Sequence, residues 1–125
     1  MRLTCAVAAL LLTETTALFS QVVAVNLDGV VHPISAEILS HAIEQAGREG
    51  AALLPVRLNT PGGLLEATRS TTEKMVASPV PVVTYVTPSG GRAASAGFFL
   101  LMAGDVAAMA PGTNTGAATP ILLGQ

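Results

Sequence analysis

GRAASAG, residues 91–97, places one serine among small side chains, between a Ser-Gly-Gly turn and an apolar run. Residues 95–104 have the composition of a buried helix, which Gly104 would end. Ser95 would then lie in the first turn, where backbone N–H groups have no partner inside the helix and the dipole favours negative charge. Such a position suits a serine nucleophile, whose hydroxyl must lose its proton. The alternative is that Ser95 only caps the helix.

A second turn, NTPGG at residues 59–63, follows the strand-like residues 56–58 and precedes a helical pattern. Gly62 and Gly63 leave their backbone N–H groups uncovered by side chains, so this turn can hold an oxyanion. The alternative is a turn that needs glycine only for its geometry. A glycine turn and a serine turn that both follow strands form the layout that acyl transfer requires.

Strand and helix patterns alternate along the chain, which predicts parallel strands with right-handed crossover helices. Both turns would then meet at the carboxyl edge of the sheet, where ligands bind in such folds. Half of the residues are hydrophobic, which suggests strands buried on both faces. Strands are expected within residues 22–31, 51–59, 80–86 and 105–109, and helices within 35–49, 64–77 and 95–104.

Two local features refine these expectations. Ser35 is a good N-cap for the helix expected at residues 35–49. Pro55 is a misfit in the strand expected at residues 51–59, because proline cannot donate a ladder hydrogen bond. Either that strand has a free edge at Pro55, or the domain is weakened there.

Three motifs resemble the NfeD family of membrane-bound serine proteases, which are relatives of signal peptide peptidase A and of the Clp protease proteolytic subunit. The motifs are RLNTPGGL (57–64), GRAASAGF (91–98) and MAPGTNTGAA (109–118). The resemblance implies an α/β fold of the Clp protease/crotonase type, with a mostly parallel sheet and crossover helices. Residues 21–125 would form such a domain, partial and incomplete at its C-terminus.

The resemblance also implies a serine peptidase of the Ser–Lys type. Ser95 would attack the peptide carbonyl, and the N–H group of Gly62 or Gly63, together with that of Ala96, would bind the oxyanion. In a full-length relative, Gly63→Val is therefore expected to lower the rate by about 10²–10³ while the fold is retained.

The general base of the family is a lysine that follows the serine, on a segment after the Pro-Gly-Thr-Asn loop. The only lysine here is Lys74, which precedes Ser95. The chain thus resembles a truncated member, expected to be inactive alone. His32, before a proline, and His41, on the outer face of the expected helix, are the other candidate bases, and both are expected to be structural or solvent-side residues.

Two other functions remain open from the sequence. One is a crotonase-like acyl-CoA enzyme, which uses the same oxyanion site without a nucleophilic serine. The other is a non-catalytic fragment that binds membranes or stomatin-like partners. For the peptidase, the expected partners are a peptide or membrane-protein substrate and a stomatin-like protein, and self-association stays open.

Composition excludes several classes of function. The formal net charge is −2 and the lysines and arginines are scattered, which argues against nucleic-acid binding. Aromatic residues make up 3% of the chain, too few for a base-stacking platform. Cys5 is the only cysteine, so no internal disulfide and no cysteine metal site can form. No cofactor and no metal are expected.

Residues 1–20 resemble a secretory signal. Arg2 supplies a positive charge, residues 3–12 are mostly apolar, and residues 13–20 are a more polar exit with small side chains. The alternative is an uncleaved anchor, although the apolar run is short for a membrane span. The domain is thus expected to be exported or membrane-associated, with its active part on the extracytoplasmic side.

If residues 1–20 are a cleaved signal, the mature chain should begin near Gln21 and lie outside the cytoplasm. N-terminal sequencing of the protein from each cell fraction measures this. An intact Met1 on protein recovered from the cytoplasm would contradict the signal and the exported location together.

Overall fold

The computed structural model describes residues 22–119, so the expected signal at residues 1–20 and Cys5 lie outside the described part. Strands and helices alternate as predicted, although two short strands, Arg92–Ala94 and Asn114–Gly116, were not expected. No helix within residues 22–119 combines the length and apolar character needed to cross a bilayer. The elements are β1 (Val25–Asp28), α1 (Pro33–Arg48), β2 (Leu54–Asn59), α2 (Leu65–Val76), β3 (Val82–Val86), β4 (Arg92–Ala94), α3 (Ala96–Met102), β5 (Val106–Met109) and β6 (Asn114–Gly116).

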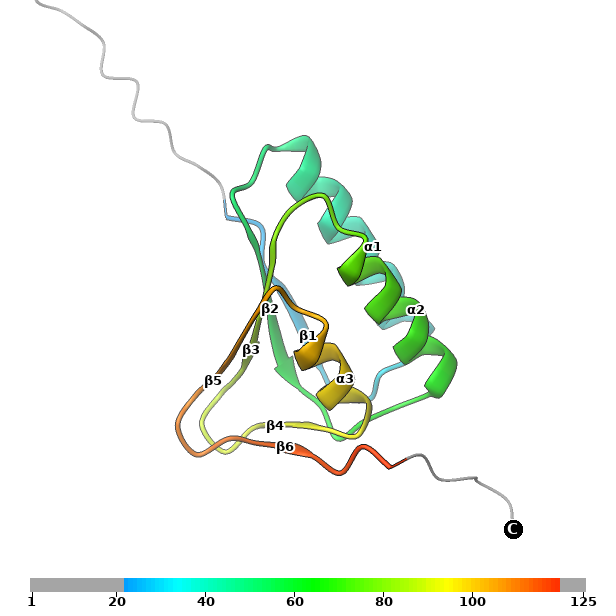
Figure 1. The fold of residues 1–125 in the computed structure, drawn as a ribbon, viewed down its shortest axis with the longest axis vertical. Helices are drawn as coiled ribbons and strands as arrows, with labels where there is room; N and C mark the ends of the chain where they lie inside the picture. Colours follow the sequence, from blue (N-terminus) through cyan, green and yellow to red (C-terminus); the bar gives the residue numbers. More distant parts are fainter. Residues whose placement is uncertain (1–21, 120–125) are drawn as a thin grey trace, which may run out of the picture.

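The main sheet has the strand order β1-β2-β3-β5, and every neighbouring pair is parallel. Each connection therefore crosses over the sheet, and α1, α2 and α3 are the helices of these crossovers. All of them lie on one side of the sheet (Figure 1). The mostly parallel α/β sheet predicted from the sequence is confirmed.

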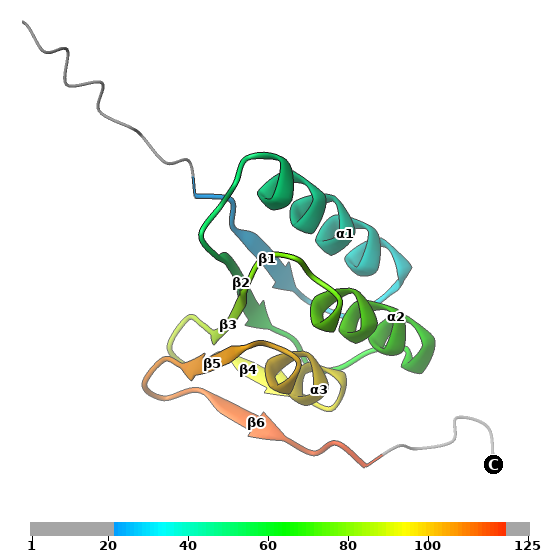
Figure 2. The same cartoon turned by 45° about the horizontal axis from the view of Figure 1, so that its top comes forward.

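A second, short layer runs across the end of the main sheet (Figure 1), and Figure 2 shows its strands β4 and β6 from another side. It contains β4 and β6, which pair in parallel, and two isolated parallel bridges, Val31 with Gly63 and Thr60 with Ala93. The chain thus repeats one unit: a long strand, a short segment in the crossing layer, and a helix. The first unit contributes Val31, the second contributes residues 60–63, and the third contributes β4.

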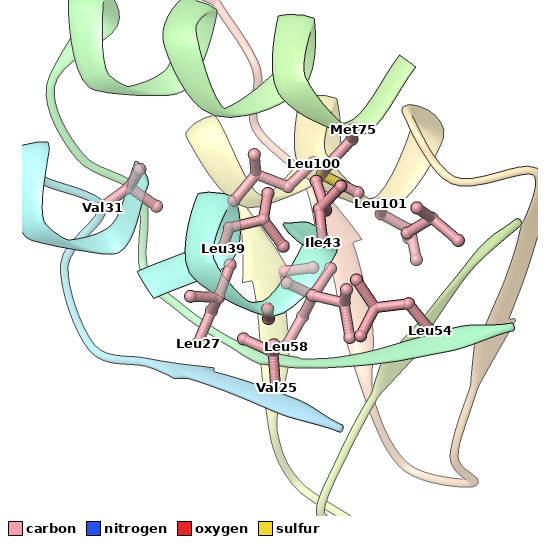
Figure 3. Packing of buried hydrophobic residues seen from close by; sticks show 14 of the residues in the cluster. Val25, Leu27, Val31, Leu39, Ile43, Leu54, Leu58, Met75, Leu100 and Leu101 are labelled. Carbon is pink, nitrogen blue, oxygen red and sulfur yellow. The ribbon is translucent and has the colours of Figure 1, made fainter. Parts of the chain in front are cut away.

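The hydrophobic core lies between the main sheet and the helices (Figure 3). Alternate residues of β1, β2 and β3 point into it, whereas the residues between them are exposed or half-buried. All four residues of β5 are exposed. The expectation that the strands are buried on both faces is therefore wrong for residues 22–119, because helices cover only one face of this sheet.

Helix α1 begins earlier than the sequence suggested. Its N-cap is His32, and Pro33 occupies the first turn, where the missing N–H of proline costs nothing. Ser35 lies at the third helical position and its Oγ accepts a hydrogen bond from the His32 N–H at 3.3 Å. The prediction that Ser35 is the N-cap is therefore wrong, although its side chain contributes to the cap from the third helical position.

Pro55 lies where the ladder between β1 and β2 has not yet begun. The Leu54 N–H donates to the Pro81 carbonyl on the β3 side at 2.8 Å. Because successive residues of a strand direct their N–H groups to opposite neighbours, the nitrogen of Pro55 faces the β1 side. Pairing with β1 starts only at Val25 and Val56. Of the two expectations for Pro55, the free edge is the one that the register supports.

Pro55→Val should therefore change the free energy of unfolding by less than about 1 kcal/mol, because no ladder hydrogen bond is restored. The matched control is Val83→Pro, which places a proline at the position of β3 that pairs with Pro55. Val83 also pairs with Val106, so β3 has neighbours on both sides there. The control should cost about 3 kcal/mol or more. Equilibrium urea denaturation measures both, and a gain of several kcal/mol in Pro55→Val would contradict the free edge.

Candidate active site

Ser95 occupies the junction between β4 and α3 in a backbone conformation that L-residues rarely adopt. Its φ is 53° and its ψ is −115°, and its side chain makes no cap hydrogen bond. Its N–H donates to the Gly116 carbonyl at 2.7 Å, which attaches it to the end of β6. Ser95 is thus the N-cap of α3 by position, but its hydroxyl does not cap the helix. Strained conformations of this kind cluster at functional sites, where the surroundings hold them in place.

The glycine turn lies directly against Ser95. A Cβ atom added to Gly62 would lie 2.9 Å from Ser95 Cβ and 3.2 Å from Ser95 Oγ. Gly62 also has φ of +128°, which side chains other than hydrogen strongly disfavour. Only glycine at position 62 lets the two turns approach this closely, so the structure brings together the two motifs that the sequence singled out.

Backbone pairing at Thr60 joins the two turns. The Thr60 N–H donates to the Arg92 carbonyl at 2.7 Å, and the Ala94 N–H donates to the Thr60 carbonyl at 3.0 Å. Asn59 adds side-chain bonds to β4 of the crossing layer and to β1 of the main sheet. Its Oδ1 accepts from the Arg92 N–H at 3.3 Å, and its Nδ2 donates to Asp28 Oδ1 at 3.3 Å.

The hydrogen bonds also distinguish the two glycines of this turn, because only one of their N–H groups is already bonded. The Gly62 N–H donates to Thr60 Oγ1 at 3.2 Å and is therefore already used. Within residues 22–119, neither the Gly63 N–H nor the Ala96 N–H donates to a protein acceptor. Of the three N–H groups expected to bind an oxyanion, those of Gly63 and Ala96 are thus free in the described residues, whereas that of Gly62 is not.

Gly63 has a second, structural reason to be glycine. A Cβ atom at this position would collide with the backbone of Val31 and would lie 2.6 Å from Val31 Cβ. The bridge between Val31 and Gly63 would be broken. The expectation that Gly63→Val keeps the fold is therefore wrong, because the backbone of Val31 fills the space that the new side chain would need.

None of the candidate bases is held beside Ser95. Lys74 Nζ donates to the Ala36 carbonyl of α1 at 3.4 Å. His32 is the N-cap of α1, and His41 is exposed on the same helix. In the part of the chain that the structure describes, no three His, Cys, Asp or Glu side chains gather as a metal site would require.

Thr60 is the residue of this site whose role the sequence did not reveal. It appeared there only as part of the NTPGG turn. A threonine two residues before a glycine can form a turn in which the hydroxyl bonds the backbone, and this signal was available in the sequence.

The chain is similar to proteins of one family. The family described as NfeD1b, N-terminal domain, matches residues 21–124. The membrane-bound protease PH1510 of Pyrococcus horikoshii is 36% identical over 112 residues, which cover 84% of this chain and 25% of that protein. The chain therefore spans about a quarter of the length of this relative.

Solved structures agree with this similarity. A lysine-to-alanine variant of the 1510-N membrane-bound stomatin-specific protease, in complex with a substrate peptide, matches with a TM-score of 0.78 and 34% identity, over 84% of this chain and 48% of that one. A serine-to-alanine variant of 1510-N matches with a TM-score of 0.77 and 32% identity, over 79% of this chain and 48% of that one. A ClpP1 variant from Listeria monocytogenes has a TM-score of 0.67 and 22% identity, over 73% of this chain and 53% of that one. The fold is thus that of ClpP-like protease domains.

Gly62→Ala should destabilise the protein more than Gly116→Ala, by about 1–3 kcal/mol, because the new methyl group would overlap the Ser95 side chain. Gly116 is the matched control: its φ is +121°, and an added Cβ would meet nothing within 4 Å. Both variants carry the same kind of backbone strain, so their difference reports the contact between the turns. Equilibrium urea denaturation measures it, and equal losses in both variants would contradict the close approach of Gly62 to Ser95.

Proposed function

The chain belongs to the NfeD family, through the family's NfeD1b N-terminal domain, and from this premise we propose that residues 21–125 form part of a serine peptidase domain of the Ser–Lys type. The reaction is acyl transfer from a peptide bond. Ser95 Oγ attacks the carbonyl carbon, and the carbonyl oxygen becomes an oxyanion that the Gly63 and Ala96 N–H groups bind.

The observation that carries this proposal is the pair of unused N–H donors on two turns that touch at Ser95. Donors fixed before the reaction stabilise the developing charge without reorganisation, and each typically contributes about 10²–10³ in rate. A surface serine that only terminates a strand would not need such neighbours. Positive φ at Ser95, with no cap bond from its hydroxyl, is consistent with a nucleophile.

We assign the general base to a lysine other than Lys74. A helix N-terminus contributes only about 0.3–1 kcal/mol, which cannot replace a base for a hydroxyl that ionises poorly at neutral pH. Lys74 donates to a carbonyl of α1, His32 is the N-cap of that helix, and His41 lies on it. The lysine-to-alanine variant of 1510-N carries a substrate peptide, which fits a catalytic lysine in that protease.

For the substrate, we propose an apolar segment of a membrane-associated protein of the stomatin type. Val30, Leu64 and Leu65 are exposed by 55%, 54% and 63% and flank the bridge between Val31 and Gly63. Exposed apolar side chains around a site favour an apolar partner. The 1510-N protease is stomatin-specific. The proposed domain works at a membrane, on its extracytoplasmic side.

Peptide hydrolysis by residues 21–125 should be near background and unchanged by Ser95→Ala, because no base reaches the nucleophile. Joining the lysine-bearing segment of the Pyrococcus protease to the chain should raise the rate. In a well-studied serine protease, loss of one member of the nucleophile–base unit costs on the order of 10⁶ in rate. Cleavage of a fluorogenic apolar peptide measures both forms.

Ser89→Ala is the control, because Ser89 lies in the turn before β4 and is exposed. The gain in the extended chain should vanish with Ser95→Ala and survive Ser89→Ala. Absence of any gain that depends on Ser95 would contradict the peptidase. Hydrolysis by residues 21–125 that disappears with Ser95→Ala would instead place a base within the chain, and Lys74→Ala and His32→Ala would then identify it.

A further inference from the structure

The hydroxyl of Thr60 holds the peptide group that precedes the oxyanion donor. Thr60 is only 1% exposed. Its Oγ1 accepts from the Gly62 N–H at 3.2 Å and donates to the Gly62 carbonyl at 3.2 Å. The same carbonyl also accepts from the Val31 N–H at 2.9 Å. Both polar groups of Gly62 are therefore held on the Thr60 side of the turn.

This arrangement fixes the direction of the Gly63 N–H. The carbonyl of Gly62 and the N–H of Gly63 belong to one planar trans peptide, so they point in opposite directions. Bonds that hold the carbonyl towards Thr60 and Val31 consequently hold the N–H away from them. Rotation of this peptide would instead direct a carbonyl oxygen, which repels an oxyanion, to the place where the donor should be.

Thr60 is also fixed relative to the serine turn. Its backbone bonds both Arg92 and Ala94 of β4. Its methyl group fills the place of the missing side chain of Gly97, because a Cβ atom there would lie 2.6 Å from Thr60 Cγ2. One residue thus contacts the oxyanion turn through its hydroxyl, β4 through its backbone, and the start of α3 through its methyl group.

We propose that Thr60 is a positioning residue of the oxyanion site, whose hydroxyl keeps the Gly62–Gly63 peptide in the orientation that offers the Gly63 N–H to the substrate. This inference rests on the proposed acyl transfer at Ser95. It assigns the hydroxyl and the methyl group different tasks, since only the hydroxyl bonds Gly62. The hydroxyl should therefore control affinity for a tetrahedral anion at Ser95, and the methyl group should control mainly packing.

Two matched pairs of variants in the full chain separate the tasks. The first pair is the unchanged protein and Thr60→Val, which removes the hydroxyl and keeps the methyl group in its place. The second pair is Thr60→Ser and Thr60→Ala, which both lack the methyl group and differ only in the hydroxyl. If valine prevents folding, the serine and alanine pair still answers the question. Thr71→Val is the control, because Thr71 is 0% exposed and its hydroxyl donates to the Ala67 carbonyl within α2.

The probe is phenylboronic acid. Its trigonal boron accepts an electron pair from Ser95 Oγ and the serine proton passes to solvent. The adduct is tetrahedral and negatively charged, and one of its oxygens takes the oxyanion position. Because affinity is measured at equilibrium, by titration calorimetry above neutral pH, the measurement needs no general base. Ser95→Ala defines binding that does not involve the serine.

Loss of the hydroxyl should weaken binding that depends on Ser95 by about tenfold or more in both pairs, the effect of one misdirected hydrogen bond. Thr60→Ser should stay within about threefold of the unchanged protein, and Thr71→Val should bind equally well even if its unfolding midpoint falls. Equal affinity with and without the Thr60 hydroxyl would overturn the positioning role alone. An unchanged protein that binds no boronate through Ser95 would overturn the proposed peptidase, and with it this inference.

Discussion

The site depends on the parallel pairing of Thr60 with β4. Its two hydrogen bonds, from the Thr60 N–H to Arg92 and from the Ala94 N–H to Thr60, join turns that belong to different crossover units. Each turn follows a strand of the main sheet, but the sheet alone leaves them as separate loops at one edge. The short crossing layer makes them neighbours at hydrogen-bond distance. Backbone pairing, rather than side-chain packing, therefore determines where Ser95 lies relative to the donors.

Three glycines allow the turns and their neighbours to approach this closely. An added Cβ atom at Gly62 would meet the Ser95 side chain, at Gly63 the Val31 backbone, and at Gly97 the Thr60 methyl group. Each glycine thus allows a contact between segments that are far apart in the sequence. Such close contacts also explain how a strained Ser95 is tolerated, because bonds on both sides hold it: its N–H to Gly116 and its carbonyl to the Phe98 N–H. Strain of this kind costs about 1–3 kcal/mol and persists only where the surroundings fix it.

The longer helices and strands could be predicted from the sequence, because hydrophobic periodicity and bounding glycines or prolines depend only on neighbouring residues. The helices at α1 and α2 and the strands β2, β3 and β5 follow from such patterns. β4 and β6 were missed because each pairs over only three residues, too few for a pattern to show. The sequence also could not show which of the Gly62 and Gly63 N–H groups is free, because that depends on Thr60 Oγ1 and on pairing with Val31, which is distant in the chain. The sequence led to a prediction of strands buried on both faces, because composition does not say which side of a sheet the helices cover.

The proposed site therefore consists of a nucleophile and two donors whose positions do not depend on any base. Their geometry is set by bonds among residues 31, 60–63, 92–97 and 116, none of which includes Lys74, His32 or His41. Oxyanion donors each contribute about 2.7–4 kcal/mol to a reaction of this kind, but only once an attacking alkoxide exists. The dipole of the seven-residue helix α3 is too weak to produce this alkoxide, since even a longer helix contributes about 1 kcal/mol at most near the surface. In the proposed mechanism, binding of the tetrahedral anion and deprotonation of the serine are thus separable. The first can be measured on the described residues themselves, whereas the second requires a group that these residues do not place at Ser95.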